Sequence, residues 1–249
     1  MKVATWNVNG IRARQAQVLE LIEREQPDIL CLQEIKAKPE QVPEELCRLA
    51  HYWCYWHGAG AYSGVGLHLR KERFPSPPQF THPSFDHETR IVQACLDDLV
   101  VASVYVPNGG KDYAVKLAFL TAMEAYVASV HDSGRALVVC GDLNVTRTDR
   151  DVHPKERKLN AIGQRPEERA LLERVLGCGL VDVGRALDPN NDNLFTWWAP
   201  WRNLRQRNIG WRLDYVLASA SLASRAAACP VLREFGTSDH GPVIATFSE

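Results

Sequence analysis

The segment "GTSDHGP" (236–242) places an aspartate next to a histidine near the end of the chain. Neighbouring side chains of an extended segment point in opposite directions, so Asp239 and His240 are not expected to act together as one acid–base pair. A histidine that does chemistry needs a partner that orients its ring. We therefore expect Asp239 and His240 to have separate tasks and the partner of His240 to come from elsewhere.

Polar side chains also follow three other apolar stretches. They are Asn7 and Asn9 in "TWNVNG", Glu34 in "CLQE", and Asp142 and Asn144 in "VVCGDLNV". A spacing of two residues places each pair on a common strand face. Carboxylate and amide oxygens with few nitrogens and no thiolates suit Mg²⁺, with Mn²⁺ as the alternative, rather than zinc. One such residue is usually a turn former or helix cap, but four strand ends of this kind favour a metal site.

The elements that must position these side chains are of mixed type. Apolar runs predict strands, among them 27–34, 99–106 and 194–198, and amphipathic spacing predicts a long helix over about 112–131. Buried strands, hairpins and helices alternate along the whole chain, which favours two mixed sheets packed face to face with helices outside. We see no linker or low-complexity tract, so we expect a single domain of residues 1–249.

Composition narrows the class of protein. The net charge of −1 gives no general sign of nucleic-acid binding. The seven scattered cysteines contain no CxxC pair, which indicates reduced thiols rather than a disulfide framework or a zinc site. Neither a signal peptide nor an apolar run of about 20 residues is evident, so we expect a cytoplasmic protein without membrane contact.

Although the net charge is close to zero, one segment of the chain is strongly basic. "WRNLRQRNIGWR" (201–212) contains four arginines and no acid, with a tryptophan at or near each end. A solvated arginine-rich loop would be the ordinary interpretation, but the tryptophans favour a binding surface. The segment 147–158 is also basic on balance.

The sequence resembles the exonuclease III family of apurinic/apyrimidinic endonucleases, within the wider endonuclease–exonuclease–phosphatase superfamily. The resemblance is carried nearly end to end by "WNVNGIRA", "LQEIKA", "YSGVGL", "VYVPNG", "GDLNV", "PEER", "GWRLDY" and "SDHGP". "GDLNV" or "SDHGP" alone would indicate only the superfamily, whereas "VYVPNG" and "GWRLDY" together are specific to its DNA-repair branch. The resemblance implies a four-layer α/β sandwich with one metal-dependent site at the sheet edge.

Residue by residue, the resemblance implies that Glu34 is the main Mg²⁺ ligand, helped by Asn9 and Asp239. Asn7 and Asp142 would lie close to the metal and the scissile phosphate. Asn9 stands where some relatives carry an aspartate, which would make the metal site less negative.

The same resemblance implies that Tyr105 and His240 contact the phosphate, that Asp214 is the partner of His240, and that Asn144 steadies the attacking water. A nearby carboxylate favours the charged form of a histidine, so His240 would suit phosphate stabilisation better than proton abstraction. Asp142 is then our candidate base, and neutral His240 is the rival.

The expected substrate is double-stranded DNA with abasic sites, nicks or 3′ ends, bound by a monomer. Phosphate contacts are expected from four arginines, Arg202, Arg205, Arg207 and Arg212. A pocket for a flipped abasic sugar is expected from three tryptophans, Trp197, Trp201 and Trp211, with a place in the core as the alternative. Asn108 and Lys111 of "VPNGGK" are further expected contacts.

His153 lies in the basic segment, and the family pattern does not require a histidine there. It could favour 3′ ends over continuous duplex, which would make the protein a specialised 3′-end-processing nuclease; a solvent-exposed loop histidine is the alternative. Two other functions compete with a DNA-repair nuclease. A phosphatase of inositol or lipid phosphates would leave Tyr105 and the tryptophan-rich loop without a purpose, and an inactive binding module should have lost a site residue.

Overall fold

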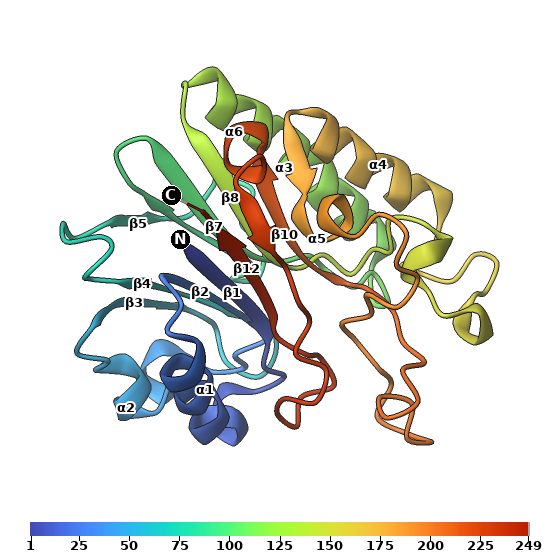
Figure 1. Ribbon diagram of the computed structural model, residues 1–249, viewed down its shortest axis with the longest axis horizontal. Coiled ribbons are helices and arrows are strands. Elements are labelled where there is room, and N and C mark those ends of the chain that lie inside the picture. The colour runs from blue at the N-terminus through green and yellow to red at the C-terminus, as the bar shows by residue number, and fades with distance from the viewer. Residues whose placement is uncertain (249) are drawn as a thin grey trace.

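The structure is a computed structural model that describes residues 1–248, and it contains two six-stranded mixed sheets packed face to face (Figure 1). The first sheet runs in the order β11 (Ala226–Ala228), β12 (Val243–Phe247), β1 (Lys2–Asn7), β2 (Ile29–Gln33), β4 (Val65–Arg70), β3 (Tyr52–His57). The second runs in the order β5 (Gln79–Thr81), β6 (Ile91–Cys95), β7 (Leu99–Tyr105), β8 (Ala136–Asp142), β10 (Asp214–Ser219), β9 (Leu180–Asp182). The predicted sandwich of two mixed sheets is confirmed.

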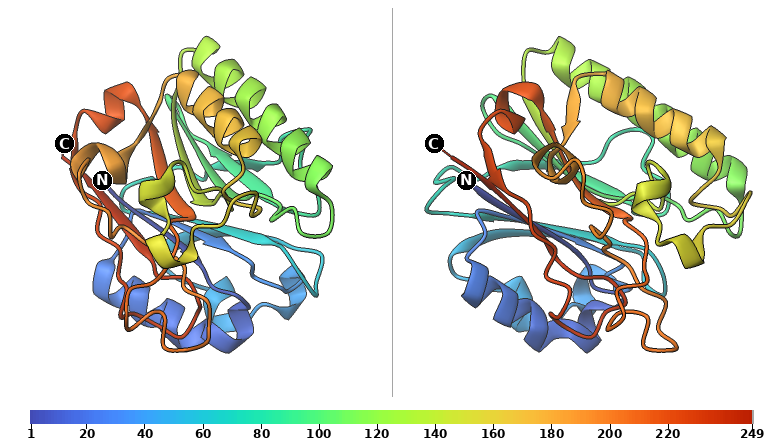
Figure 2. Two further views of the ribbon diagram at one scale, coloured as in Figure 1. Left: turned by 90° about the vertical axis from the view of Figure 1, so that its right-hand side faces the viewer. Right: turned by 45° about the vertical axis from the view of Figure 1, so that its right-hand side comes forward.

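Helices cover the outer face of each sheet (Figure 2). On the first sheet these are α1 (Ile11–Glu25) and the short α2 (Glu44–Cys47), and on the second they are α3 (Tyr113–Asp132) and α4 (Pro166–Gly177). Two more short helices, α5 (Val183–Leu187) and α6 (Ala220–Ala223), flank β10 and β9. Single 3₁₀ turns occupy Pro39–Gln41, Asp149–Asp151 and Pro154–Glu156.

Strand β8 shows why apolar and polar residues do not alternate along the buried strands. Val138 and Cys140 face the core between the two sheets, whereas Leu137 and Val139 face the core under α3 and α4. A strand between two apolar layers is buried on both sides, so successive residues are all apolar. The expected strand at 194–198 did not form, because Trp197 makes only isolated bridges to Trp211 and His240.

Helix α3 satisfies a length and hydropathy criterion for a membrane span, alone among the helices of residues 1–248. Its sequence is not an uninterrupted apolar run, because it includes Lys116 and Glu124. Its apolar side chains, including Phe119, Leu120 and Met123, pack in the core beneath the second sheet, and the helix lies beside α4. Packing within this fold accounts for the composition of α3.

The strand ends that matter here meet at one edge of the sandwich. Strands β1, β2, β7 and β8 finish there, β10 begins there, and the loop before β12 reaches the same edge, on the side away from the two chain termini (Figure 1). The loops of residues 143–165 and 188–213 extend from this edge as well (Figure 2).

Candidate active site

Three acidic or phenolic side chains are aligned across neighbouring strands of the second sheet. Tyr105 is the register partner of Asp142, and Asp142 is the register partner of Asp214. The strands approach closely at Gly141, where a Cβ atom would lie 1.8 Å from the carbonyl oxygen of Val104. Only glycine allows that approach, so "CGD" places Asp142 directly between its two neighbours.

Glu34 connects this row to the first sheet. Its Oε1 accepts hydrogen bonds from the Tyr105 hydroxyl at 2.5 Å and from Asn7 Nδ2 at 3.2 Å, and its Oε2 lies 2.9 Å from Lys36 Nζ. Burial raises the pKa of Glu34, but the hydrogen bonds from Tyr105 and Lys36 outweigh burial and hold it below the ordinary value. Glu34 is therefore a carboxylate at neutral pH.

Asn7 has a different orientation from the one that a metal ligand needs. Its Nδ2 donates to Glu34 and, at 2.9 Å, to Asp142 Oδ2, while its Oδ1 accepts from the backbone N–H of Asn9 at 3.0 Å. That backbone donor fixes which end of the amide is the oxygen. Asn7 therefore holds two carboxylates together as a donor, and in this arrangement it is not an oxygen ligand.

Asp142 is buried at the centre of the site. The backbone N–H of Asn144 donates to its Oδ1 at 2.9 Å, and Asn144 Nδ2 donates to the carbonyl of Val106 at 2.9 Å. Burial raises the pKa of Asp142 to about 7, with the charges of Asp214 and Glu34 adding to burial and the charge of His240 opposing it. A carboxyl group with this pKa can hold or release a proton near neutral pH.

His240 has the distant partner that we expected. Its Nδ1 lies 2.8 Å from Asp214 Oδ2, and its Nε2 faces Asp142 Oδ2 at 3.8 Å. Burial alone would lower the pKa of His240, but the charges of Asp214 and Asp142 and the hydrogen bond to Asp214 raise it to about 10. The ring is an imidazolium at neutral pH, with Nε2–H directed into the site.

Thr196 completes the orientation of Asp214 and was not identified from the sequence. Its hydroxyl donates to Asp214 Oδ2 at 2.6 Å and accepts from the backbone N–H groups of Leu213 and Asp214. Thr196 lies in "FTWW", and a threonine among apolar side chains gives no sign in the sequence of a carboxylate partner.

Asp239 has different partners from its neighbour. Its Oδ1 accepts from Asn9 Nδ2 at 2.8 Å and its Oδ2 from Trp197 Nε1 at 2.9 Å. Burial raises the pKa of Asp239, but the charge of His240 and these two hydrogen bonds lower it below the ordinary value. The two residues thus point to separate groups.

Lys36 is a second residue that sequence reasoning missed, although it lies in the quoted "LQEIKA". Its ammonium contacts Asn9 Oδ1 at 2.6 Å as well as Glu34 Oε2 at 2.9 Å. Two oxygens from different loops therefore already converge on one cationic centre.

Glu34, Asn9 and Asn144 also have positive φ angles, near 50°, a strained backbone that concentrates at functional sites.

Two of the three tryptophans line the site. Trp197 packs edge-on against Trp211, with ring centroids 5.6 Å apart, and its ring centroid lies 6.5 Å from that of His240. Trp201 lies on the outer turn with 59% of its surface exposed. Trp197 and Trp211 can thus form an apolar wall beside the imidazolium, while Trp201 belongs to the rim.

The four arginines of residues 201–212 divide into two pairs. Arg202 and Arg207 are exposed, as a phosphate contact requires. The guanidinium of Arg205 instead donates to the backbone carbonyls of Arg233, Phe235 and Ser238, the loop that carries Asp239 and His240. Each of its three nitrogens thus holds this loop, so Arg205 has a structural role in place of the expected phosphate contact.

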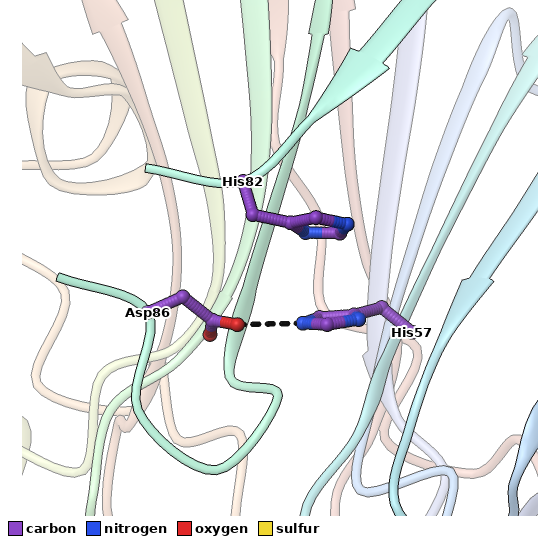
Figure 3. Close-up of side chains that lie close together, drawn as sticks. All are labelled: His57, His82 and Asp86. Atoms are coloured by element: carbon purple, nitrogen blue, oxygen red, sulfur yellow. Dashed lines mark hydrogen bonds and ion pairs between the residues drawn. The ribbon is translucent and has the colours of Figure 1, made fainter. Parts of the chain in front are cut away.

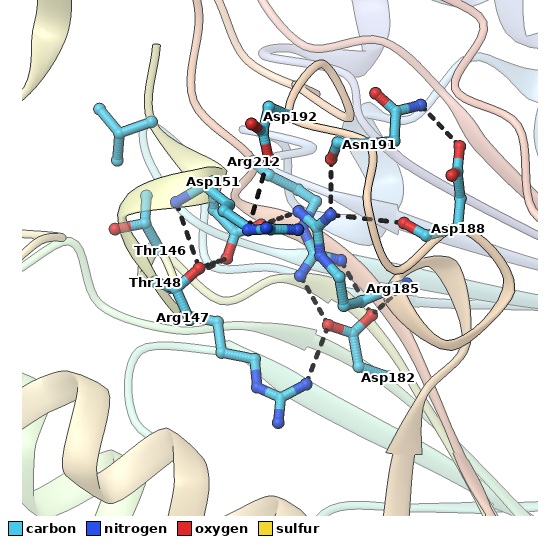
Figure 4. Close-up of polar contacts among 12 residues, drawn as sticks. Thr146, Arg147, Thr148, Asp151, Asp182, Arg185, Asp188, Asn191, Asp192 and Arg212 are labelled. Atoms are coloured by element: carbon cyan, nitrogen blue, oxygen red, sulfur yellow. Dashed lines mark hydrogen bonds and ion pairs between the residues drawn. The ribbon is translucent and has the colours of Figure 1, made fainter. Parts of the chain in front are cut away.

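Arg212 is also not available to DNA (Figure 4). It is 3% exposed, its Nε lies 2.7 Å from Asp151 Oδ1, and its Nη1 and Nη2 reach the two oxygens of Asp182 at 2.8 and 2.6 Å. Arg185 Nη2 also donates to Asp151 Oδ1 at 2.8 Å. Arg212, just before β10, therefore connects Asp182 of β9 with Asp151 of the basic segment. Its role is structural, and the expected DNA contact by Arg212 is wrong for this arrangement.

The remaining expected contacts lie on loops at the same edge. Asn108 and Lys111 are exposed, and Asn108 Oδ1 accepts from the backbone N–H of Gly110. His153 is half-buried, its backbone N–H donates to the carbonyl of Gly210, and its ring lies edge-on to Phe195. His153 thus joins the basic segment to the arginine-rich loop.

A buried ion pair supports the loops beneath the site. Lys116 and Glu168 form an ion pair with fully buried side chains. Lys116 Nζ also donates to the backbone carbonyl of Asn144 at 2.7 Å, and Glu168 Oε1 accepts from the backbone N–H of Arg165 at 3.0 Å. The "PEER" segment therefore holds "GDLNV" in place through Lys116.

Comparisons with known proteins identify the family of this chain. Residues 4–240 match the family model described as the endonuclease/exonuclease/phosphatase family. Recombination repair protein 1 of Drosophila melanogaster is 35% identical over 100% of this chain, which spans only 37% of that protein's length. An exodeoxyribonuclease of Bacillus subtilis strain 168 is 33% identical, with 98% of each chain covered.

Solved structures show the same fold. The 3′-5′ exonuclease NExo from Neisseria meningitidis superimposes with a TM-score of 0.91 at 29% identity, and an AP endonuclease from Archaeoglobus fulgidus with a TM-score of 0.89 at 29% identity. Both comparisons cover 100% of each chain. The chain belongs to the endonuclease/exonuclease/phosphatase family, in the branch of the exodeoxyribonuclease III enzymes.

Proposed function

We propose that this protein is a Mg²⁺-dependent phosphodiesterase that cuts DNA on the 5′ side of abasic sites and removes blocked 3′ termini and nucleotides. The observation that supports it most is the position of Asp142, between Asn7 and Asn144 and facing the imidazolium of His240. The names of the exodeoxyribonuclease and AP endonuclease relatives support the same class of reaction. A lipid or inositol phosphatase has no comparable support.

Glu34, Asn9 and Asp239 would hold the metal ion. The oxygens of Glu34 and Asn9 already contact one cation, the Lys36 ammonium, and the donors are carboxylate and amide oxygens. Such a set suits Mg²⁺, with Mn²⁺ as the alternative. A bound ion would act as a Lewis acid that stabilises charge on the phosphoryl oxygens.

The side chains of this chain would supply the remaining chemistry. Asp142 would orient and deprotonate the attacking water, because its pKa of about 7 leaves it substantially ionised at neutral pH. His240, charged and held by Asp214, would donate from Nε2 to a phosphoryl oxygen. Tyr105, whose hydroxyl now binds Glu34, lies where it could reach the same phosphate. Asn144 would position Asp142.

DNA would bind across the loops at this edge. Exposed cationic side chains, Lys111, Arg202 and Arg207, would contact phosphates and fix the register of the duplex. The wall of Trp197 and Trp211 beside His240 would accept an abasic sugar flipped out of the helix. Trp201, exposed on the rim, would contact the neighbouring bases.

We further propose that residues 1–249 act as a cytoplasmic monomer with one domain. Strands from both ends of the chain, β1 and β12, pair in one sheet, which is difficult to reconcile with two domains. Among residues 1–248 the exposed large apolar side chains, Tyr62, Leu159, Leu187 and Trp201, are far apart in sequence, and two lie in loops near the site. They offer no obvious interface for a second copy.

A single labelled duplex tests the function. We expect it to be cut on the 5′ side of an abasic analogue in the presence of Mg²⁺ and to remain intact in EDTA. Parallel reactions on nicked, recessed and 3′-phosphate ends measure the balance of activities. Cutting that persists unchanged in EDTA, or release of inorganic phosphate from inositol phosphates at a higher rate than from DNA, would contradict the proposal.

His153 tests the preference for 3′ ends, which the likeness to a 3′-5′ exonuclease favours. Because His153 lies in the basic segment and its backbone N–H donates to the carbonyl of Gly210 in the arginine-rich loop, its ring could obstruct continuous duplex while leaving room for a free end. His153→Gly is expected to raise abasic-site incision relative to 3′-phosphate removal, measured as the ratio of the two rates. An unchanged ratio would contradict this role, and His153 would then only cap the 3₁₀ turn at 154–156.

A further inference from the structure

A group of side chains of the types that bind metal ions lies outside the proposed active site (Figure 3). His57 ends β3, the outermost strand of the first sheet, and His82 directly follows β5, the outermost strand of the second. Asp86 lies four residues further on, in the loop before β6. Each of the three offers a ligand atom, and these atoms lie within 4.8 Å of one another.

The carboxylate of Asp86 is fixed in direction. Its Oδ1 accepts hydrogen bonds from the backbone N–H groups of Arg90 at 2.8 Å and Ile91 at 3.1 Å. Its Oδ2 therefore faces the His57 ring, 2.6 Å from Nε2. A carboxylate held in this way needs little further ordering to act as a ligand.

The two imidazoles are also arranged as a pair. The rings of His57 and His82 are stacked, with centroids 3.8 Å apart and 26° between their planes. His82 Nε2 lies 2.9 Å from the Tyr55 hydroxyl, and its Nδ1 lies 3.3 Å from the carbonyl oxygen of Ile91. Whichever nitrogen of His82 binds a metal, the other keeps an outer hydrogen-bond partner, as metal-binding histidines usually do.

We propose that His57, His82 and Asp86 form a Zn²⁺ site that joins the outer strands of the two sheets. Two imidazoles and one carboxylate are a zinc-type ligand set with room for a water molecule, unlike the oxygens around Glu34. Tetrahedral zinc ligands are about 3.3 Å apart, so His57 and Asp86 must separate by somewhat more than half an ångström. The His82 side chain is exposed and can adjust to the same centre. The site does not depend on the proposed nuclease function.

Zinc titration of the full chain at saturating Mg²⁺, followed by calorimetry, tests the site. We expect His57→Ala and His82→Ala each to weaken zinc binding by at least about tenfold. The matched control is His87→Ala, which removes an exposed histidine from the same loop and should bind zinc like the unmodified protein. Glu34→Ala should also retain this zinc ion, which separates it from metal bound at the proposed active site.

Thermal unfolding supplies a second readout that does not involve catalysis. Because a ligand of the folded state stabilises it, zinc should raise the Tm of the unmodified protein and of His87→Ala, and should raise the Tm of His57→Ala by less at the same zinc concentration. Equal zinc affinity in the unmodified protein, His57→Ala and His82→Ala would overturn the proposal. So would the absence of zinc binding at saturating Mg²⁺, and the three residues would then form only an ion pair and a ring stack.

Discussion

Replacing Asp142 by asparagine is expected to lower the rate of DNA cutting by about 10²- to 10⁴-fold, the contribution of a positioned general base. Asparagine has nearly the same size, and its oxygen can still accept the hydrogen bond from the backbone of Asn144. Its amide nitrogen cannot accept a proton and would face the donating Nδ2 of Asn7. The measurement is the single-turnover rate on the abasic-analogue duplex, with thermal unfolding as the check that the fold is retained.

The matched control is Asp97→Asn, which makes the same change on the exposed turn between β6 and β7. It should leave the single-turnover rate unchanged. If Asp142→Asn retained a near-normal rate in a folded protein, Asp142 could not be the base, and the rival assignment to His240 would be favoured.

The pH dependence of the unmodified protein separates the same two assignments. A base must be deprotonated to act, so with Asp142 as the base the rate rises as the pH increases through about 7 and then levels off. With His240 as the base, the rate would continue to rise until the pH reached about 10, where its imidazolium loses a proton. The profile of kcat/KM against pH measures the difference.

The position of the site followed from local patterns in the sequence. Each of Glu34, Asp142 and Asn7 comes at the end of an apolar run, and a strand that finishes at a sheet edge must place its last polar residue there. The separate directions of Asp239 and His240 also agree with the expectation that neighbouring side chains point apart, although residues 235–239 form bends and not a regular strand. Both features can be predicted from the order of residues within a single segment.

Contacts between distant segments could not be predicted in the same way. Arg207 and Arg212 have the same side chain and lie five residues apart in one basic segment, yet one is exposed and the other is buried against Asp151 and Asp182. Which arginine meets those acids depends on the packing of β9 and β10. The amide direction of Asn7 and the contact of Lys36 with Asn9 likewise depend on neighbours from other loops.

Replacing Arg212 by leucine is expected to lower the free energy of unfolding by about 3–5 kcal/mol, because it removes the main counter-charge of two buried carboxylates. Asp182 would lose the two-pronged contact with Arg212 and keep only the longer contact with Arg147 at 3.6 Å, and Asp151 would keep Arg185 as its cation. The free energy is measured by urea unfolding, where the midpoint should fall with no change in slope. Arg212→Lys keeps the charge but not the planar pair of donors, so it should lose less stability.

DNA binding distinguishes this structural role from a phosphate contact. The control is Arg207→Ala, at an exposed arginine of the same segment, which should leave stability unchanged and reduce the slope of log affinity against log salt by about 1. Arg212→Lys, studied where it is folded, should keep the slope of the unmodified protein. If the Arg212 variants instead kept normal stability and lost affinity in a salt-dependent way, the guanidinium would have to leave Asp151 and Asp182 to bind DNA, and the buried network would not be the state that meets the substrate.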